Sequence, residues 1–189
     1  MTSNRAGINQ TQVPTFLDDH RWTSNVTHLP ALHNPPSETV YAVWIGTNDL
    51  GNAGWLTESQ QPRGLPLTYE TDCVFAQLDR LYEDAGARSF VVMNLAPLEL
   101  LPQYALPELG GVEVSRFWQD KLAYNDNMTQ IAEKMRQYRT MVNAVYEWQT
   151  PYLVKLTDRY PDSAFAVFDV YSLVSVAARF LPHLFLTVN

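Results

Sequence analysis

Three short apolar runs along the chain, rich in β-branched and aromatic residues, predict buried strands. They are residues 40–45, 90–93 and 165–168, and none alternates cleanly with polar positions. Runs of this kind are typical of parallel sheets, because both faces of such strands are covered.

Helical patterns separate the three runs. Between the first two, apolar residues recur at helical spacing from Val74 to Tyr82, and Gly86 fits a C-cap glycine. Between the second and third, residues 115–160 are helical in composition, and Thr150-Pro151 is typical of an N-cap followed by proline. We therefore expect two helices here, with a break near Gln149. Alternating strands and helices predict an α/β fold with helices on both faces of the sheet.

Ligand sites in such folds lie just beyond the C-terminal ends of the strands. The candidate segments are therefore residues 46–49, 94–97 and 169–172. Two segments rich in glycine and proline, residues 52–66 and 97–111, are expected to form surface loops over the site.

Composition and charge narrow the possible partners. The 189 residues are 46% hydrophobic, which suits one globular domain, and the net charge of −7 would repel a phosphate backbone. We therefore expect no nucleic-acid partner. We also expect the protein to be a monomer. The most apolar stretch, residues 173–188, contains Arg179, Pro182 and His183, so we expect no membrane span.

Signals for the cellular compartment conflict. The polar start of the chain contains no signal peptide, which taken literally indicates an intracellular protein. Three Asn-x-Thr sequons, at Asn9, Asn25 and Asn127, matter only in the secretory route and are candidate glycosylation sites. The lone Cys73 is expected to be a small buried hydrophobe. The four histidines show no metal-site spacing, so we expect no metal.

Gly46-Thr47-Asn48-Asp49 follows the first apolar run and is the strongest candidate for chemistry. An asparagine there can aim its amide N–H at a carbonyl oxygen that becomes negative during acyl transfer, a contact worth roughly 2.7–4 kcal/mol. Gly46 would let the backbone turn tightly beside the substrate. Asp49 is expected to cap the following turn.

Larger stretches of the chain resemble one family. Residues 41–51, Tyr-Ala-Val-Trp-Ile-Gly-Thr-Asn-Asp-Leu-Gly, resemble the third conserved block of the GDSL, or SGNH, ester hydrolases. Residues 86–98, 124–128 and 160–173 resemble its later strands and long helix in the same order, so the likeness runs from about residue 40 to 173. Within that superfamily the pattern is most similar to fungal acetyl esterases of carbohydrate esterase family sixteen.

The resemblance implies a three-layer α/β/α, flavodoxin-like parallel sheet. It also implies a secreted enzyme without a cofactor that removes acetyl groups from plant cell-wall carbohydrates, with Asn48 and Gly46 in the oxyanion hole. Trp55 is a candidate for stacking on a sugar ring. Trp44, Trp118 and Trp148 are expected to be core residues, and Asp169 a structural residue.

Two blocks of the family pattern are not found in the chain. The Gly-Asp-Ser that carries the nucleophile is absent, as is the Gly-x-Ser-x-Gly elbow of other hydrolases. No histidine completes the final Asp-x-x-His, because Leu17, Asn25, Pro30 and Phe180 stand three positions before the four histidines. We therefore expect a single partial domain, incomplete at both ends, with a divergent tail at residues 174–189.

That expectation leaves two functions open. One is an ester hydrolase represented by a fragment without its serine and histidine, which alone would be inactive. The other is an inactive fragment or pseudoenzyme that at most binds glycans. A missing central strand would also expose apolar faces and predicts poor solubility.

Overall fold

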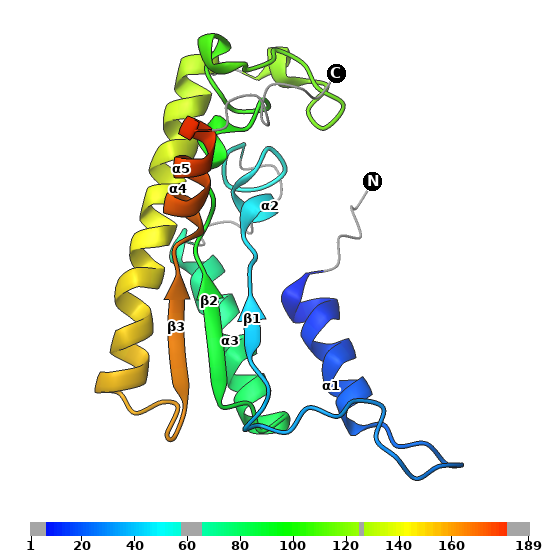
Figure 1. The fold of residues 1–189 in the computed structure, drawn as a ribbon. Helices are drawn as coiled ribbons and strands as arrows, with labels where there is room; N and C mark the ends of the chain where they lie inside the picture. Colours follow the sequence, from blue (N-terminus) through cyan, green and yellow to red (C-terminus); the bar gives the residue numbers. More distant parts are fainter. Residues whose placement is uncertain (1–6, 58–65, 125–126, 181–189) are drawn as a thin grey trace.

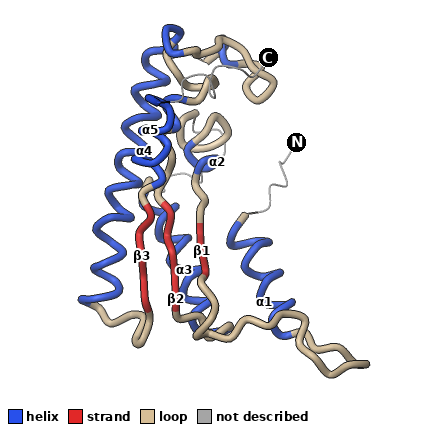
Figure 2. Tube along the Cα trace, viewed as in Figure 1, coloured by secondary structure: helices blue, strands red, loops and turns tan. Residues whose placement is uncertain are grey.

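The computed structural model describes residues 7–57, 66–124 and 127–180. Its elements follow the order expected of an α/β chain, with three parallel strands separated by helices (Figures 1 and 2). They are η1 (Ile8–Gln12), α1 (Val13–Arg21), β1 (Tyr41–Val43), α2 (Thr47–Leu50), α3 (Thr68–Asp84), β2 (Ser89–Met93), η2 (Leu98–Leu100), η3 (Pro107–Leu109), η4 (Lys121–Ala123), α4 (Met128–Pro151), η5 (Tyr152–Leu156), β3 (Ala164–Phe168) and α5 (Val170–Phe180).

The sheet has the order β1-β2-β3, and both strand pairs are parallel. Tyr41, Phe90 and Phe165 lie in one register row across the three strands. The rings of Phe90 and Phe165 stack with centroids 4.6 Å apart, and Tyr41 lies 5.9 Å from Phe90. Aromatic packing across the strands therefore anchors the core on this face of the sheet.

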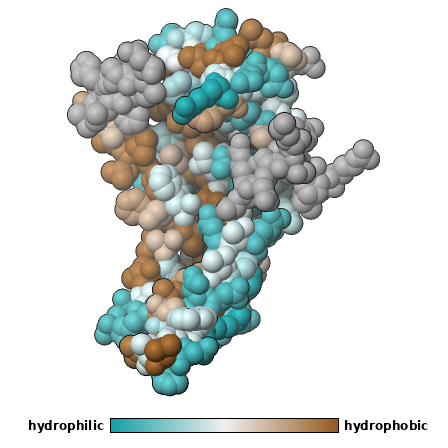
Figure 3. Space-filling view, turned by 90° about the vertical axis from the view of Figure 1, so that its right-hand side faces the viewer, coloured by the Kyte–Doolittle hydropathy of each residue, from teal (hydrophilic) through white to brown (hydrophobic). Residues whose placement is uncertain are grey.

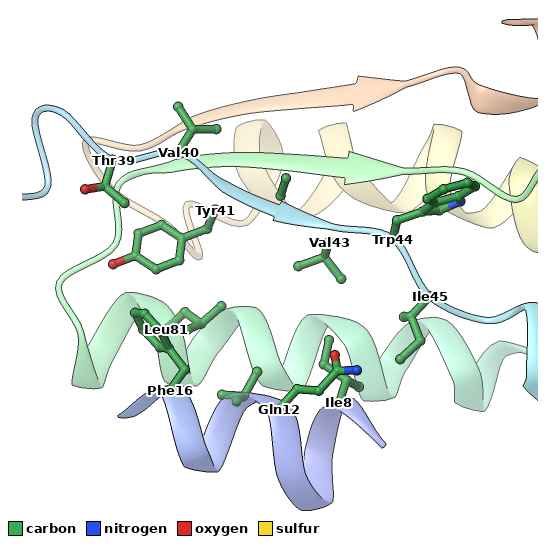
Figure 4. A pocket seen from close by; sticks show the side chains of 12 residues that line it. Ile8, Gln12, Phe16, Thr39, Val40, Tyr41, Val43, Trp44, Ile45 and Leu81 are labelled. Carbon is green, nitrogen blue, oxygen red and sulfur yellow. The ribbon is translucent and has the colours of Figure 1, made fainter. Parts of the chain in front are cut away.

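Burial alternates along β1, and this alternation overturns one prediction. Tyr41 is buried, whereas Trp44, expected in the core, is 57% exposed. Figure 4 shows Trp44 and Ile45 pointing to opposite sides of the chain, with Ile45 directed toward α3. Trp44 therefore lies on the side of the chain opposite to α3, where it is exposed.

One part of the surface carries several exposed apolar residues. Figure 3 shows them gathered along the left-hand side of its view, which is the side that faces the viewer in Figure 1. The exposed apolar residues include Trp44, Phe168, Leu173 and Val176. Poor solubility stays a prediction, for which this exposed surface is a physical reason.

The helical segment before β3 differs from the expected pair. Residues 115–123 form a bridge and a short 3-10 turn, and α4 begins at Met128, where Asn127 and Gln130 form a capping box. No break occurs near Gln149: α4 continues to Pro151, and the Thr150 hydroxyl donates to the Tyr146 carbonyl inside the helix instead of capping a new one. The chain continues directly after Pro151 as the wider π-helical turn η5.

Two other predictions in this region can be compared with the structure. Gly86 has a φ of 68° just after α3, as expected of a residue that ends a helix in the left-handed conformation. Trp118 is buried, as predicted, whereas Trp148 is 71% exposed on the outer side of α4, so its assignment to the core was wrong.

Helix α4 is fastened to the end of β2 by one amide side chain. The Asn143 side chain accepts from the Leu95 N–H at 2.8 Å and donates to the Leu95 carbonyl at 3.0 Å. Leu95 itself is fully buried. Both backbone groups of Leu95 are thus paired by a single residue 48 positions along the chain.

Replacing Asn143 with alanine leaves the Leu95 N–H and carbonyl without these partners. We expect Asn143→Ala to lower the free energy of unfolding by about 2 kcal/mol, since each unpaired buried group costs about 1–3 kcal/mol and neighbours relax in part. Thr140→Ala, at an exposed position of the same helix, is the control and should change stability by less than about 0.5 kcal/mol. Urea unfolding followed by circular dichroism measures both, and equal effects would contradict this role for Asn143.

Candidate functional site

The three segments after the strands meet at one end of the sheet. Figure 1 shows α2 beyond the end of β1 and α5 beyond the end of β3. Carboxyl ends of parallel strands share one edge, where ligand sites of such folds form. This edge is therefore the candidate site predicted from the sequence.

Gly46 makes the turn that leads from β1 into α2. Its φ is 113°, in the left-handed region that side chains disfavour. A Cβ at this position would collide with the Glu70 carboxyl and would lie 2.9 Å from Leu95 Cδ2. Only glycine fits here, for reasons of both conformation and space.

Asn48 is the second residue of α2 and lies exposed beyond the strand end. The Gly46 carbonyl accepts from the Leu50 N–H at 3.1 Å, which closes the short helix. Leu50 is fully buried and anchors α2 to the core. Gly46 and Asn48, both predicted as site residues, therefore belong to one turn.

The loop after α2 is folded back onto it. Asp49 was expected to cap the following turn. Its main-chain carbonyl accepts from the Trp55 N–H at 2.8 Å, and its carboxylate accepts from its own backbone N–H. Gly54 passes so close to Asp49 that a Cβ would lie 2.6 Å from its carbonyl carbon. Trp55 is half-buried and packs against the core, which leaves only part of the indole accessible to a ligand.

The two segments expected to form loops over the site contact each other. The Gln103 side chain donates to Asn52 Oδ1 at 2.8 Å, and the Asn52 side chain donates to the Phe117 carbonyl at 2.9 Å. Tyr104 is buried, and its hydroxyl accepts from the Asn52 N–H at 3.3 Å. Residues 58–65 of the first segment lie outside the described residues.

Asn94 and Asp169 connect the ends of β2 and β3. The Asn94 side chain donates to Asp169 Oδ1 at 2.8 Å and accepts from the Tyr171 N–H at 3.0 Å. Asp169 Oδ1 also accepts from the Ser172 N–H at 3.0 Å, which caps α5. Hydrogen bonds from the Ser172 side chain, then from the Asn94 side chain and the Ser172 backbone, lower the Asp169 pKa. Asp169 thus has the structural role expected of it.

Glu70 is the residue at this edge that the sequence did not reveal. It lies in the first turn of α3 and is only 5% exposed. Burial and then the negative charge of Asp49 raise its pKa to about 8, against which a hydrogen bond from Tyr146 acts weakly. A glutamate in the first helical turn is usually a surface residue that favours the helix dipole, so its position gave no signal.

The described histidines lie away from this edge. His20 is in the last turn of α1, and its Nδ1 is 3.0 Å from Asn34 Oδ1. His28 and His33 belong to residues 22–40, which run at the opposite end of the sheet from α2 (Figure 1). His183 is outside the described residues.

The candidate glycosylation sites lie at the surface, and Cys73 lies partly inside. Asn9, Asn25 and Asn127 are all exposed, and Asn127 Oδ1 accepts from the Gln130 N–H at 2.9 Å. Glycosylation of the three stays a prediction. Cys73 is half-buried against the core rather than fully buried, and burial raises its pKa.

Neither a metal site nor a membrane-spanning helix is present in the parts of the chain that the structure describes. In those parts, no cluster of three or more His, Cys, Asp or Glu side chains has an arrangement that would hold a metal ion. None of the helices within residues 7–57, 66–124 and 127–180 combines the length and apolarity needed to cross a membrane.

A groove of about 510 Å³ runs along the outer edge of β1 (Figure 4). Residues of α1, including Val13 and Phe16, form one wall, and residues 39–45 form the other. The groove ends at Ile45, next to Gly46, and Asn48 is not among its lining residues. It is a feature of the strand edge and not of the turn that carries Asn48.

Comparisons with known proteins agree on one family. The model of the family described as GDSL-like Lipase/Acylhydrolase matches residues 3–176. An acetylesterase of Hypocrea jecorina is 35% identical over 174 residues, which are 92% of this chain and 47% of that protein. An acetylesterase of Thermothelomyces thermophilus is 38% identical over 68 residues, 35% of this chain and 20% of that protein. The chain thus spans half or less of the length of these curated relatives.

The raised pKa of Glu70 predicts how stability depends on pH. The folded chain holds this proton up to about pH 8, whereas an unfolded glutamate releases it near pH 4.3. The contribution of Glu70 to the free energy of unfolding is therefore fully present below about pH 4. It is lost as the pH rises to about 8, by roughly 1 kcal/mol per pH unit. Glu70→Gln should flatten this decline, measured by urea unfolding across the range.

Glu147→Gln is the matched control, since Glu147 is exposed on α4 beside Tyr146. It should leave the decline as in the unmodified chain. A decline that is the same in Glu70→Gln would show that another group is responsible.

Proposed function

Because the chain belongs to the GDSL-like lipase/acylhydrolase family, we propose that it forms the oxyanion-binding part of a carboxylic ester hydrolase. The observation that carries the proposal is the turn at the end of β1, where Gly46 directs the chain so that Asn48 lies exposed beyond the strand. This is the edge of a parallel sheet at which ligands bind.

The reaction explains why an asparagine belongs there. When a hydroxyl attacks an ester carbonyl, the carbonyl oxygen becomes negative, and an amide N–H that is already in place stabilises it without reorganisation. In our proposal the Asn48 side-chain amide supplies one donor, and Gly46 lets the backbone approach the oxyanion. No cofactor is needed, because a serine, a base and hydrogen-bond donors suffice for this reaction.

In this proposal the nucleophile and the base come from segments outside these 189 residues. The chain contains no Gly-Asp-Ser and no Asp-x-x-His, while the Hypocrea jecorina acetylesterase is about twice as long as the matched region. The outer edge of β1 lies beside an apolar groove and has no strand partner among the described residues. A strand paired there in parallel would end beside the Asn48 turn and could carry the serine.

The names of the relatives suggest the acyl group. Both are named acetylesterases, and we propose acetylated plant cell-wall carbohydrates as substrates of a secreted, monomeric enzyme. Three exposed sequons are compatible with secretion. The accessible part of Trp55, in the loop next to Asn48, is our candidate for contact with a sugar ring.

By itself, the 189-residue chain should not act as an esterase. With p-nitrophenyl acetate we expect only the background rate of hydrolysis, because the proposed nucleophile and its base both lie outside this chain. Release of p-nitrophenolate measures this rate, with the heat-denatured chain at equal concentration as the control. Saturable turnover that phenylmethylsulfonyl fluoride abolishes would show an active serine within the chain and contradict the assignment.

The role of Asn48 can be tested in a complete active site. A hybrid enzyme is made by replacing the matched 174 residues of the Hypocrea jecorina acetylesterase with the corresponding region of this chain. In this hybrid Asn48→Ala should lower kcat about 100- to 1,000-fold with little change in KM, because the donor acts in the transition state.

Thr47→Ala is the control, an exposed neighbour in the same helix that should change kcat less than about threefold. Equal activity of Asn48→Ala and the parent hybrid would rule out the oxyanion role. A folded hybrid that binds acetylated xylo-oligosaccharides but hydrolyses no ester would favour the glycan-binding alternative.

A further inference from the structure

Glu70 lies directly beneath the turn that carries Asn48. Its carboxyl fills the space into which a side chain at position 46 would project. Glu70 is in the first turn of α3, whereas Gly46 follows β1, so the contact joins two elements at the candidate site. The carboxyl thus supports the turn from the interior.

The polar surroundings of Glu70 are sparse. The Tyr146 hydroxyl on α4 donates to Glu70 Oε1 at 3.5 Å, a long hydrogen bond. The second carboxyl oxygen, Oε2, is buried and has no hydrogen-bond partner among the described residues. An ionised carboxylate in this position would lack the partners that a buried charge requires.

Three other titratable groups among the described residues face Glu70, and one of them, Asp49, also disfavours its charge. Asp49 on α2 adds a negative charge nearby, and Cys73 on α3 is close enough for Glu70 to influence its pKa. The remaining group, Tyr146, contributes the single hydrogen bond. Burial, the main cause, and Asp49 together raise the Glu70 pKa to about 8, so the carboxyl is mainly neutral at neutral pH.

A charge on Glu70 would act on the turn in two ways. It would draw water or a proton donor toward a space that the Gly46 backbone occupies, because an unpaired buried charge is costly. It would also place a negative charge beneath the position where Asn48 is to stabilise an oxyanion, and like charges at short range oppose each other. Both effects weaken the oxyanion site.

We propose that Glu70, as a neutral carboxyl, is a positioning residue that holds the Gly46–Asn48 turn in its oxyanion-binding conformation, and that ionisation of Glu70 displaces this turn. The catalytic part of this inference rests on the proposed function. The structural part, the dependence of the turn on the protonation of Glu70, does not.

The structural part is tested on the 189-residue chain by NMR. The Gly46 backbone amide and the Asn48 side-chain amide should both shift with pH, with one midpoint near 8. In Glu70→Gln, which keeps the size of the side chain and cannot ionise, both signals should stay near their low-pH positions. The Glu70 carboxyl carbon, followed by ¹³C labelling in the unmodified chain, should titrate with the same midpoint.

Asp49→Asn distinguishes Glu70 from its charged neighbour. It removes the repulsion, so the midpoint should fall, but the titration of the turn should persist. Turn signals that do not move between about pH 6 and about pH 10, or that titrate equally in Glu70→Gln, would overturn the proposal.

The catalytic part is tested in the hybrid enzyme. With a midpoint near 8, about a tenth of Glu70 is neutral at about pH 9, so kcat should be about tenfold below its neutral-pH plateau. Glu70→Gln should keep kcat within about twofold over this range. A decline above pH 8 that is unchanged in Glu70→Gln would overturn the positioning role. An inactive hybrid would count against the esterase proposal, and the NMR titration would still decide the structural part.

Discussion

The packing of Gly46 against the Glu70 carboxyl is the contact on which the geometry of the candidate site depends. The chain leaves β1 with a φ of 113° at Gly46, and a side chain here would meet Glu70 and Leu95. The backbone therefore approaches α3 more closely than any residue except glycine allows. Because α2 starts at the next residue, this contact sets where Asn48 lies.

Helix α4 holds the surrounding pieces in place. Arg139, Asn143 and Tyr146 follow one another at spacings of four and three residues, so they lie on one face of the helix. Arg139 forms an ion pair with Glu99, Asn143 binds the Leu95 backbone, and Tyr146 reaches Glu70. One face of α4 thus binds residues that follow β1 and β2 in the sequence. This explains how irregular loops at this edge keep a defined arrangement.

The sequence predicted those features that local patterns encode, and failed where tertiary context decided. The strands, their parallel order and the helix end at Gly86 follow from apolar runs and a glycine. Trp44 was misplaced because a run of apolar residues does not reveal that one side of β1 is uncovered. Thr150-Pro151 carries the local signals of a helix start, but packing of Tyr146 and Leu153 in the core keeps the helix going. The raised pKa of Glu70 depends on burial by residues that are distant in the sequence, and no local pattern encodes it.

The electrostatics of the site follow from the same packing. Asp49 and Glu70 are two carboxyl groups in different surroundings, one exposed and one only 5% exposed; burial raises the pKa of both, and that of Glu70 to about 8. A smaller apolar residue at position 70 would remove the charge but leave a cavity beneath Gly46, whereas an ionised carboxylate would fill the space at the cost of an unpaired charge. A neutral carboxyl meets both requirements, which is why support of the turn and a raised pKa occur in the same residue.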